Sequence, residues 1–282
     1  MIVDSHLHLF RRGYGHFGTT SSPLGDLSDI EAYERLREKH GVVAGLVVCY
    51  EADGIDPSNN AYVRELAASR PWIHSVAYLS PSSAPGKEIV ASLLAAGHSG
   101  IALYLPDEAS ANALYEWPSE SWSMLSDANA VVSLNARPEA TRHLGKLVRQ
   151  AGNSQFLFSH LGLPGRHQTV PTREEAAQRI SSLLDLAALP NVGVKLSGLY
   201  AVDPSPPHLA AWPFIELLIE RFGAENLHWG SDFSPSLEFV TFDETLEGYS
   251  ALPRSRQALV LGESLAAKLQ RVHRPHYHSR HQ

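Results

Sequence analysis

The amino-acid sequence predicts an α/β protein built as a single (β/α)8 TIM barrel over residues 1–272. Short apolar runs alternate with amphipathic stretches along the chain, which is the pattern of strands that alternate with helices. Eight such pairs share the 282 residues, or about 35 residues each. The apolar runs are nearly continuous, as in parallel strands buried on both faces. The main alternative, a doubly wound open sheet, would carry a Gly-x-Gly-x-x-Gly turn, which the sequence lacks.

The first half of the chain contains strand and helix patterns with clear stop signals. The Ile2-Val3 run begins the first strand. Gly41 and Gly97 each follow a helical pattern, and glycine readily takes the left-handed conformation that ends a helix. Pro71 limits another helix because the residue before proline avoids the helical region. The strands predicted after the first cover 42–50, 73–79 and 100–105, and the predicted helices cover 28–40, 58–70 and 87–96.

The second half repeats this alternation. Pro138 begins a helix, because its fixed φ suits the first helical turn. The predicted strands cover 130–135, 155–160, 191–197 and 227–232; the predicted helices cover 119–129, 138–151, 173–188 and 207–222, with closing helices in 240–272. The last ten residues, 273–282, hold four of the 15 histidines and show no apolar periodicity. We expect them to form a flexible tail and exclude them from the site.

Composition narrows the class of protein. The chain is 44% hydrophobic, enough for a large core, and its single cysteine, Cys49, excludes an internal disulfide framework. A formal charge of −7 argues against nucleic acid as a partner. No apolar run approaches the ~20 residues that span a bilayer, and Met1 leads directly into the first strand without a leader pattern. We expect a cytoplasmic protein whose partner is a small-molecule substrate, and we leave a homo-oligomer open.

Histidine and aspartate side chains follow three of the predicted strands. Side chains alternate faces along a strand, so His6 and His8 point the same way at the end of the first strand. His160 ends the sixth strand and Asp232 ends the eighth. In TIM barrels the C-terminal ends of the strands meet at the active site. These four residues predict a site for one divalent metal ion, most simply Zn²⁺, with Asp232 and His160 as catalytic residues and Asp232 also able to take a proton from water.

Candidate substrate-binding residues lie at or after other strand ends. Tyr104 closes the fourth strand, Arg137 follows the fifth, and Lys195 lies in the seventh. Arg166 lies in the loop after the sixth strand. Arginine can hold a substrate carboxylate with two parallel hydrogen bonds, although an arginine at such a position is more often a solvated surface charge. For Lys195, a buried salt bridge is an alternative to contact with substrate.

Four motifs in this order carry a resemblance to a known family. They are Asp4-Ser5-His6-Leu7-His8, Ser159-His160-Leu161-Gly162-Leu163-Pro164, Val194-Lys195-Leu196-Ser197-Gly198-Leu199 and Trp229-Gly230-Ser231-Asp232-Phe233-Ser234-Pro235. Together they resemble the amidohydrolase superfamily, in its amidohydrolase-2 branch of TIM-barrel hydrolases. The second and third motifs are most similar to those of lactone hydrolases. The resemblance spans nearly the whole chain and implies that His6, His8, His160 and Asp232 form the site.

The resemblance also implies an enzymatic function. The leading hypothesis is a hydrolase that opens a lactone or related cyclic ester by attack of an activated water. The family contains metal-dependent members and lactonases that work without metal, so both remain open. An arginine that can hold a substrate carboxylate in relatives is replaced within Gly100-Ile101-Ala102, which weakens a dicarboxylate substrate. The alternatives are a metal-dependent decarboxylase and a catalytically silent barrel that binds a small molecule.

Overall fold

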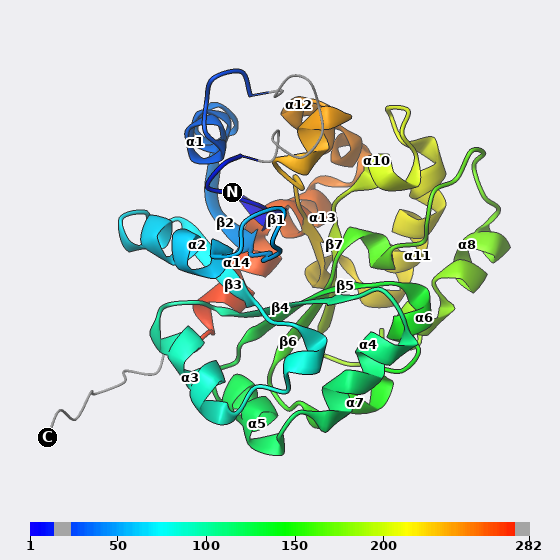
Figure 1. Ribbon diagram of the computed structural model, residues 1–282. Coiled ribbons are helices and arrows are strands. Elements are labelled where there is room, and N and C mark those ends of the chain that lie inside the picture. Colours follow the sequence, from blue (N-terminus) through cyan, green and yellow to red (C-terminus); the bar gives the residue numbers. More distant parts are fainter. Residues whose placement is uncertain (14–23, 274–282) are drawn as a thin grey trace, which may run out of the picture.

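Eight parallel strands form the centre of the protein in the computed structural model, which describes residues 1–13 and 24–273 (Figure 1). They lie side by side in the order of the sequence, and each pairs in parallel with the next. The strands are β1 (Ile2–Leu7), β2 (Val42–Val48), β3 (Ile73–Tyr78), β4 (Gly100–Leu105), β5 (Val131–Ala136), β6 (Gln155–Phe158), β7 (Val192–Leu196) and β8 (Leu227–Trp229). An isolated parallel bridge between Leu7 and Phe233 closes the ring, so the predicted TIM barrel is confirmed.

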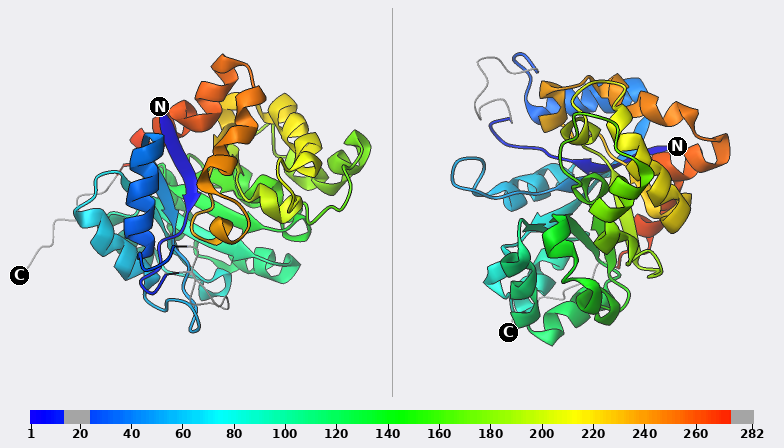
Figure 2. Two further views of the ribbon diagram at one scale, coloured as in Figure 1. Left: turned by 90° about the horizontal axis from the view of Figure 1, so that it is seen from above. Right: turned by 90° about the vertical axis from the view of Figure 1, so that its right-hand side faces the viewer.

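Helices surround the barrel in all three ribbon views (Figures 1 and 2). They are α1 (Asp29–His40), α2 (Asn59–Ala68), α3 (Lys87–Ala95), α4 (Glu108–Ala113), α5 (Ser119–Asp127), α6 (Pro138–Thr141), α7 (Gly145–Gln150), α8 (Arg173–Arg179), α9 (Ser181–Leu184), α10 (Leu199–Val202), α11 (Trp212–Phe222), α12 (Phe242–Glu247), α13 (Arg254–Ala258) and α14 (Ser264–Gln270). The first helix begins at a capping box on Ser28 and ends at left-handed Gly41, as predicted.

The structure corrects several predicted helix boundaries. The continuous helix predicted over 138–151 is two helices, α6 and α7. The helix predicted over 173–188 is also interrupted, because Ile180 leaves the helical region with φ −109° and ψ 19°. The predicted flexible tail lies outside the described residues except for His273, whose backbone N–H donates to Ala128 O at 2.8 Å. No described helix has the length and apolar character needed to cross a membrane.

Two apolar clusters stabilise this arrangement. The inner one fills the barrel with Val3, Leu46, Val48, Val76, Ala102, Val131 and Leu157, against Leu265 and Leu269 of α14. Gly262, just before α14, lies so close to the start of β1 that a Cβ atom there would meet Met1 O at 2.8 Å. The helix therefore closes the N-terminal end of the barrel. The larger cluster lies between the strands and the outer helices.

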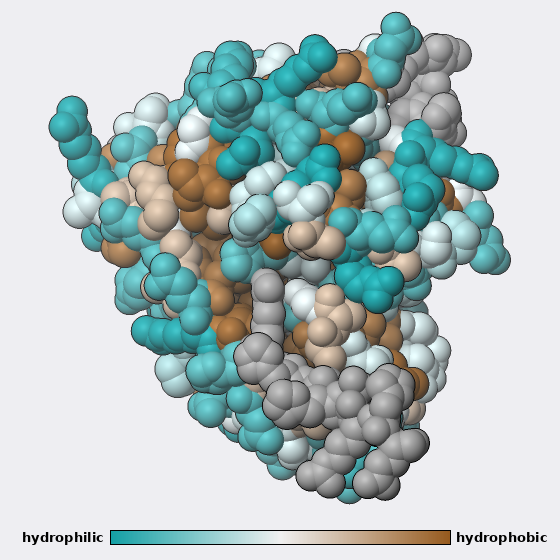
Figure 3. Space-filling view, turned by 90° about the vertical axis from the view of Figure 1, so that its left-hand side faces the viewer, coloured by the Kyte–Doolittle hydropathy of each residue, from teal (hydrophilic) through white to brown (hydrophobic). Residues whose placement is uncertain are grey.

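The surface is mostly hydrophilic, although apolar residues appear in a band on the face seen in Figure 3. Exposed large apolar side chains include Met1 and Val43 at the start of the first two strands and Ile89 on α3. Scattered exposure of this kind is normal for a folded protein. Because α14 closes the N-terminal end of the barrel, only the opposite end, where the strands end in polar residues, is left for a site.

Candidate active site

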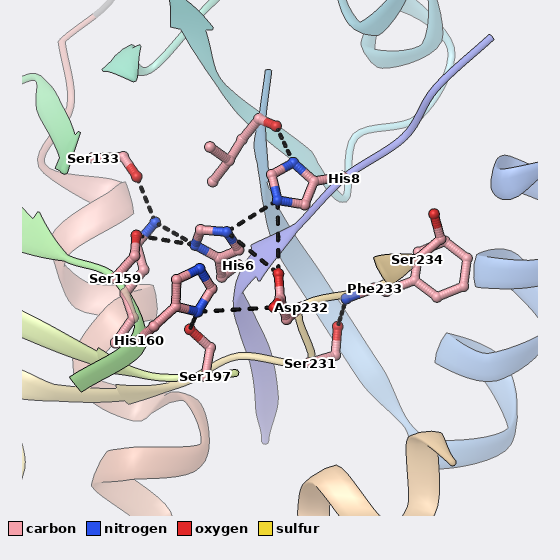
Figure 4. Close-up of polar contacts among 12 residues, drawn as sticks. His6, His8, Ser133, Ser159, His160, Ser197, Ser231, Asp232, Phe233 and Ser234 are labelled. Atoms are coloured by element: carbon pink, nitrogen blue, oxygen red, sulfur yellow. Dashed lines mark hydrogen bonds and ion pairs between the residues drawn. The ribbon is translucent and has the colours of Figure 1, made fainter. Parts of the chain in front are cut away.

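His6, His8 and Asp232 meet at the C-terminal end of the barrel (Figure 4). The Nε2 atoms of His6 and His8 are 3.1 Å apart. Oδ1 of Asp232 lies 3.6 Å from His6 Nε2 and 3.7 Å from His8 Nε2. All three side chains are buried. Residues that are 226 positions apart in the chain thus place two nitrogens and one oxygen around a common point.

The Nδ1 atoms of both imidazoles also have hydrogen-bonding partners. Nδ1 of His8 is 2.8 Å from the carbonyl oxygen of Val48. A carbonyl only accepts, so this nitrogen carries the proton and His8 Nε2 carries a lone pair. Nδ1 of His6 lies 3.2 Å from Ser159 Oγ and 3.3 Å from Lys195 Nζ. Burial lowers the pKa of both histidines, and Lys195 adds to this effect at His6, so both rings are neutral at pH 7.

These three atoms fit a zinc ion. Tetrahedral ligands at ~2.0–2.2 Å from zinc are about 3.4 Å from one another, close to the three separations of His6, His8 and Asp232. The ligand atoms of these residues lie within 4.8 Å of one another, so the group could hold a metal ion. A proton on His6 Nδ1, donated to Ser159, leaves His6 Nε2 free as a ligand. His160, which we predicted as a fourth ligand, lies outside this group among the described residues.

His160 lies beside the group on a turn after β6. Its Nδ1 is 3.0 Å from Ser197 Oγ and 3.8 Å from Asp232 Oδ2. β6 ends at Phe158, earlier than predicted, because His160 and the three residues after it have positive φ values of 52° to 77°. Left-handed backbone costs a residue other than glycine ~1–2 kcal/mol, so strain is held at this site. Burial lowers the pKa of His160 to about 4, and the ring is neutral at pH 7.

Asp232 also has a left-handed backbone, with φ 55°. β8 ends at Trp229, so Asp232 sits on a turn beyond the predicted strand end. The Tyr200 hydroxyl donates to Asp232 Oδ2 at 2.6 Å, which leaves Oδ1 facing the two histidines. Burial raises the pKa of Asp232 to about 6, against the lowering effects of His8 and Tyr200. At pH 7 the carboxylate is therefore mostly ionised, with a basicity suited to proton transfer near neutrality.

Asp4 connects the two strands that carry the site. Its carboxylate accepts the backbone N–H of His6 at 3.0 Å and that of Ser231 at 2.9 Å. It also accepts the hydroxyls of Tyr33 and Ser231. Backbone hydrogen bonds from Asp232 N–H to His6 O at 2.8 Å and from His8 N–H to Phe233 O join the same two segments, so this buried carboxylate adds to the contacts that hold Asp232 beside His6. Burial raises the pKa of Asp4 to about 6.

Lys195 lies inside the barrel, in contact with His6. It is fully buried, and its Nζ donates to Ser133 Oγ at 2.7 Å. Burial lowers its pKa from 10.5 to about 7. No carboxylate of the described residues lies within ion-pair distance of this amine, so the predicted buried salt bridge is absent there. The geometry favours positioning of His6 over the substrate contact that we predicted for Lys195.

The other predicted substrate-binding residues differ in their position relative to the site. Tyr104 is half-buried at the end of β4, and burial, followed by the charge of Asp232, raises the pKa of its hydroxyl. Arg137 and His160 line the same cavity of about 370 Å³. Arg166 is exposed and is not part of the lining of that cavity. Tyr104 and Arg137 thus remain the better candidates for contact with substrate.

Sequence reasoning missed two positioning residues. Tyr200 and Asp4 each bond a site residue, but neither was proposed as part of the site, whereas Ser197 was expected at the end of the seventh strand without a stated role. Asp4 and Ser197 belong to the quoted motifs, so their position beside His6 and near His160 was available as a signal. Tyr200 follows the third motif directly, but its contact with Asp232 crosses 32 residues of chain and no periodicity indicates it.

The family model for amidohydrolases, in the amidohydrolase-2 branch, matches residues 3–262. The chain therefore belongs to the amidohydrolase-2 family, which confirms the resemblance of the motifs and supports an enzyme. The proteins to which the chain is similar include a lactonase in sequence and a hydrolase and a decarboxylase in structure.

Individual relatives are distant. Over 56 residues the chain is 43% identical to an L-fucono-1,5-lactonase from Burkholderia ambifaria, a stretch that covers 20% of this chain and only 19% of that protein. A zinc-bound amidohydrolase from Burkholderia multivorans has a TM-score of 0.77 at 20% identity, covering 96% of this chain and 99% of that one. A 2-pyrone-4,6-dicarboxylic acid hydrolase structure from Pseudomonas putida has a TM-score of 0.70 at 23% sequence identity. The match covers 96% of this chain and 97% of that one. A 5-carboxyvanillate decarboxylase from Sphingomonas paucimobilis has a TM-score of 0.58 at 11% sequence identity. The match covers 95% of this chain and 98% of that one. At these identities the structures share the fold.

Proposed function

We propose that this protein is a hydrolase that opens a lactone or related cyclic ester with water. The observation that carries the proposal is the Asp232 carboxylate, whose Oδ1 lies within 3.7 Å of the Nε2 atoms of both His6 and His8. A buried carboxylate with a pKa of about 6, aimed at two neutral imidazoles, is suited to activating water at neutral pH. The family's lactonase relatives point to the same chemistry.

In the proposed reaction Asp232 takes a proton from the attacking water. The water oxygen forms a bond to the acyl carbon, and the ring C–O bond then breaks. Asp232 returns the proton to the leaving alkoxide, so that the product is a hydroxy acid. Tyr200 holds the carboxylate in position by its 2.6 Å hydrogen bond to Oδ2.

His160 serves in this proposal as a neutral donor to the carbonyl oxygen. Ser197 binds its Nδ1 at 3.0 Å; when this hydroxyl donates, Nε2 carries the proton and is free to bond the substrate. His6, His8 and Asp232 would hold a zinc ion, which when bound lowers the pKa of a bound water and polarises a carbonyl. Zinc identity and the presence of one ion per chain are part of the proposal.

Asp232→Asn tests the central role. Asparagine keeps the shape and tolerates left-handed backbone, but it cannot take a proton. We expect normal folding and a loss of at least about a hundredfold in kcat. Asp185→Asn, at an exposed position, is the matched control and should behave like wild type. Kinetics, thermal melting and zinc content are measured on the same preparations. Wild-type melting with more than about a third of wild-type kcat would exclude Asp232 from the mechanism.

The same preparations distinguish the reaction classes. A panel of lactones and aromatic carboxylic acids is incubated with the enzyme, and both acid release and carbon dioxide are followed. We expect acid release from a lactone without carbon dioxide. Carbon dioxide from an aromatic acid would replace the proposal by a decarboxylase. Ligand binding with no turnover of any ester, lactone, amide or acid would indicate a silent barrel.

A further inference from the structure

Phe239 is a large apolar side chain that stays mostly exposed beside the site, with an exposed fraction of 55%. Its ring stacks on that of Tyr200, with the ring centroids 4.7 Å apart and the planes inclined by only 10°. Tyr200 is the residue whose hydroxyl donates to Asp232 Oδ2 at 2.6 Å. A single side chain therefore separates Phe239 from the carboxylate on which the proposed reaction depends.

Tyr200 lies on a helix of a single turn, α10, which covers only Leu199–Val202. The backbone bonds of this turn include one from Asp203 N–H to Leu199 O at 2.9 Å. A helix this short gains little stability from its own hydrogen bonds. The hydrogen bond to Asp232 fixes the hydroxyl end of the Tyr200 side chain, and a contact on the ring face restricts rotation of the rest of it.

The backbone that carries Phe239 is bonded to Asp232 itself. The Ser236 N–H donates to Asp232 O at 3.0 Å. Ser236 O in turn accepts the N–H groups of Phe239 and Val240, each at 2.9 Å. Val240 is buried, which fixes the residue directly after Phe239. Phe239 thus has a defined backbone position although its side chain is exposed.

The chain after Phe239 is attached to β8, the strand that leads to Asp232. The buried ring of Phe242 meets the ring of Trp229 edge to face, with the centroids 5.9 Å apart and the planes at 81°. Trp229 Nε1 also donates to Thr245 O at 2.7 Å. The segment is held on both sides of Phe239, so the position of this ring over Tyr200 follows from the fold.

These contacts form a closed loop around the carboxylate. Backbone hydrogen bonds lead from Asp232 to Phe239, the stacked rings lead to Tyr200, and the Tyr200 hydroxyl returns to Asp232 Oδ2. Asp232 is only 5% exposed, although it lies at the C-terminal end of the barrel. A hydrogen bond to an ionised group is stronger where water is kept away from it. Phe239 covers one face of Tyr200 and adds to this exclusion of water.

We propose that Phe239 is a positioning residue of the site, because its stacking keeps the Tyr200 hydroxyl on Asp232 Oδ2. Oδ1 of the same carboxylate then stays directed at the two histidines. The effect on rate rests on the proposed lactone hydrolysis, whereas the effect on the Tyr200 hydrogen bond does not depend on any substrate.

A double-mutant cycle tests the coupling, with the lactone of the panel that is hydrolysed fastest. Phe239→Ala should lower kcat about twofold to tenfold, the range of an aromatic contact, with little change in KM. Phe239→Trp keeps an aromatic ring and should retain at least about half of wild-type kcat. In a Tyr200→Phe background, Phe239→Ala should change kcat by less than about 1.5-fold, because no hydroxyl is left to position. Ile89→Ala removes another exposed apolar side chain and is the control.

A spectroscopic measurement makes the test independent of turnover. Tyrosine is labelled with ¹³C at Cζ, whose chemical shift reports the hydrogen bond of the attached hydroxyl, and the Tyr200 resonance is identified by its absence from Tyr200→Phe. We expect Phe239→Ala to move this resonance towards its value in the urea-unfolded chain, and Phe239→Trp and Ile89→Ala to leave it in place. All variants should melt within about 2 °C of wild type, as exposed substitutions do.

Two results would overturn the inference. One is an unchanged Tyr200 resonance in Phe239→Ala, whatever the melting temperature. The other is a loss of kcat that is equal with and without the Tyr200 hydroxyl, because the two side chains would then act independently. A shifted Tyr200 resonance in a protein that hydrolyses no lactone would support the positioning role of Phe239 and reject the proposed function.

Discussion

Replacement of the buried Lys195 by methionine should stabilise the protein while it impairs the site. Burial lowers the Lys195 pKa from 10.5 to about 7. The unfolded chain therefore binds more protons than the folded one between these pH values. At pH 7 this difference corresponds to ~4 kcal/mol of lost stability. The sign follows from the lowered pKa: the penalty is largest near and below pH 7 and disappears as the pH approaches 10.5.

Methionine has a similar length and no charge to bury. The change also removes the 2.7 Å hydrogen bond to Ser133, and this loss offsets ~1–2 kcal/mol of the stability gained by removing the charge. We expect a net gain of ~2 kcal/mol at pH 7, or about 4 °C in Tm for a chain of this size. The gain should fall to near zero at about pH 9.5, where the lysine is mostly neutral in the folded state. His6 loses one neighbour of its Nδ1, so kcat should fall about tenfold to a hundredfold.

The assay is thermal and urea unfolding of wild type, Lys195→Met and the control Lys146→Met at both pH values. Lys146 is exposed, so its replacement should change Tm little. An unchanged or lower Tm for Lys195→Met at pH 7 would refute the reasoning, because it would show that the folded protein compensates the buried charge. A gain that does not shrink with rising pH would also refute it.

Three further predictions follow from contacts of the site. Gly198→Ala should lower kcat at least about tenfold, because the new Cβ would lie 2.5 Å from His160 Nδ1 and the residue has a left-handed φ of 63°. Steady-state kinetics of this variant are compared with those of Gly54→Ala, whose Cβ would meet no atom within 4 Å. Asp4→Ala should lower the free energy of unfolding by at least ~2 kcal/mol in urea, because it leaves four donors without their acceptor; an unchanged value would contradict the positioning role. Protein lacking residues 274–282 should bind about one zinc per chain by metal analysis; less than a tenth of an equivalent, with full activity in chelator, would favour metal-free hydrolysis.

The sequence alone determines the architecture of this protein. Apolar periodicity and the stops at glycine and proline are local properties, and they place all eight strands to within a few residues. The family motifs are local too, so His6, His8, His160 and Asp232 could all be predicted to lie at one end of the barrel. The structure brings these residues together there.

Only the tertiary structure decides how each group is used. The left-handed turns at His160 and Asp232 shorten two strands and turn the side chains towards each other. Aspartate and histidine adopt positive φ more often than most residues, but this tendency does not specify which of them do so in this chain. Distant parts of the chain are joined by the hydrogen bond from Tyr200 to Asp232, by the contact of buried Lys195 with His6 and by the packing of the Tyr50 ring against Tyr104. Such contacts depend on strand register and on the direction of each side chain within the closed barrel. A one-residue shift reverses that direction, and the linear pattern does not contain this information to the required accuracy.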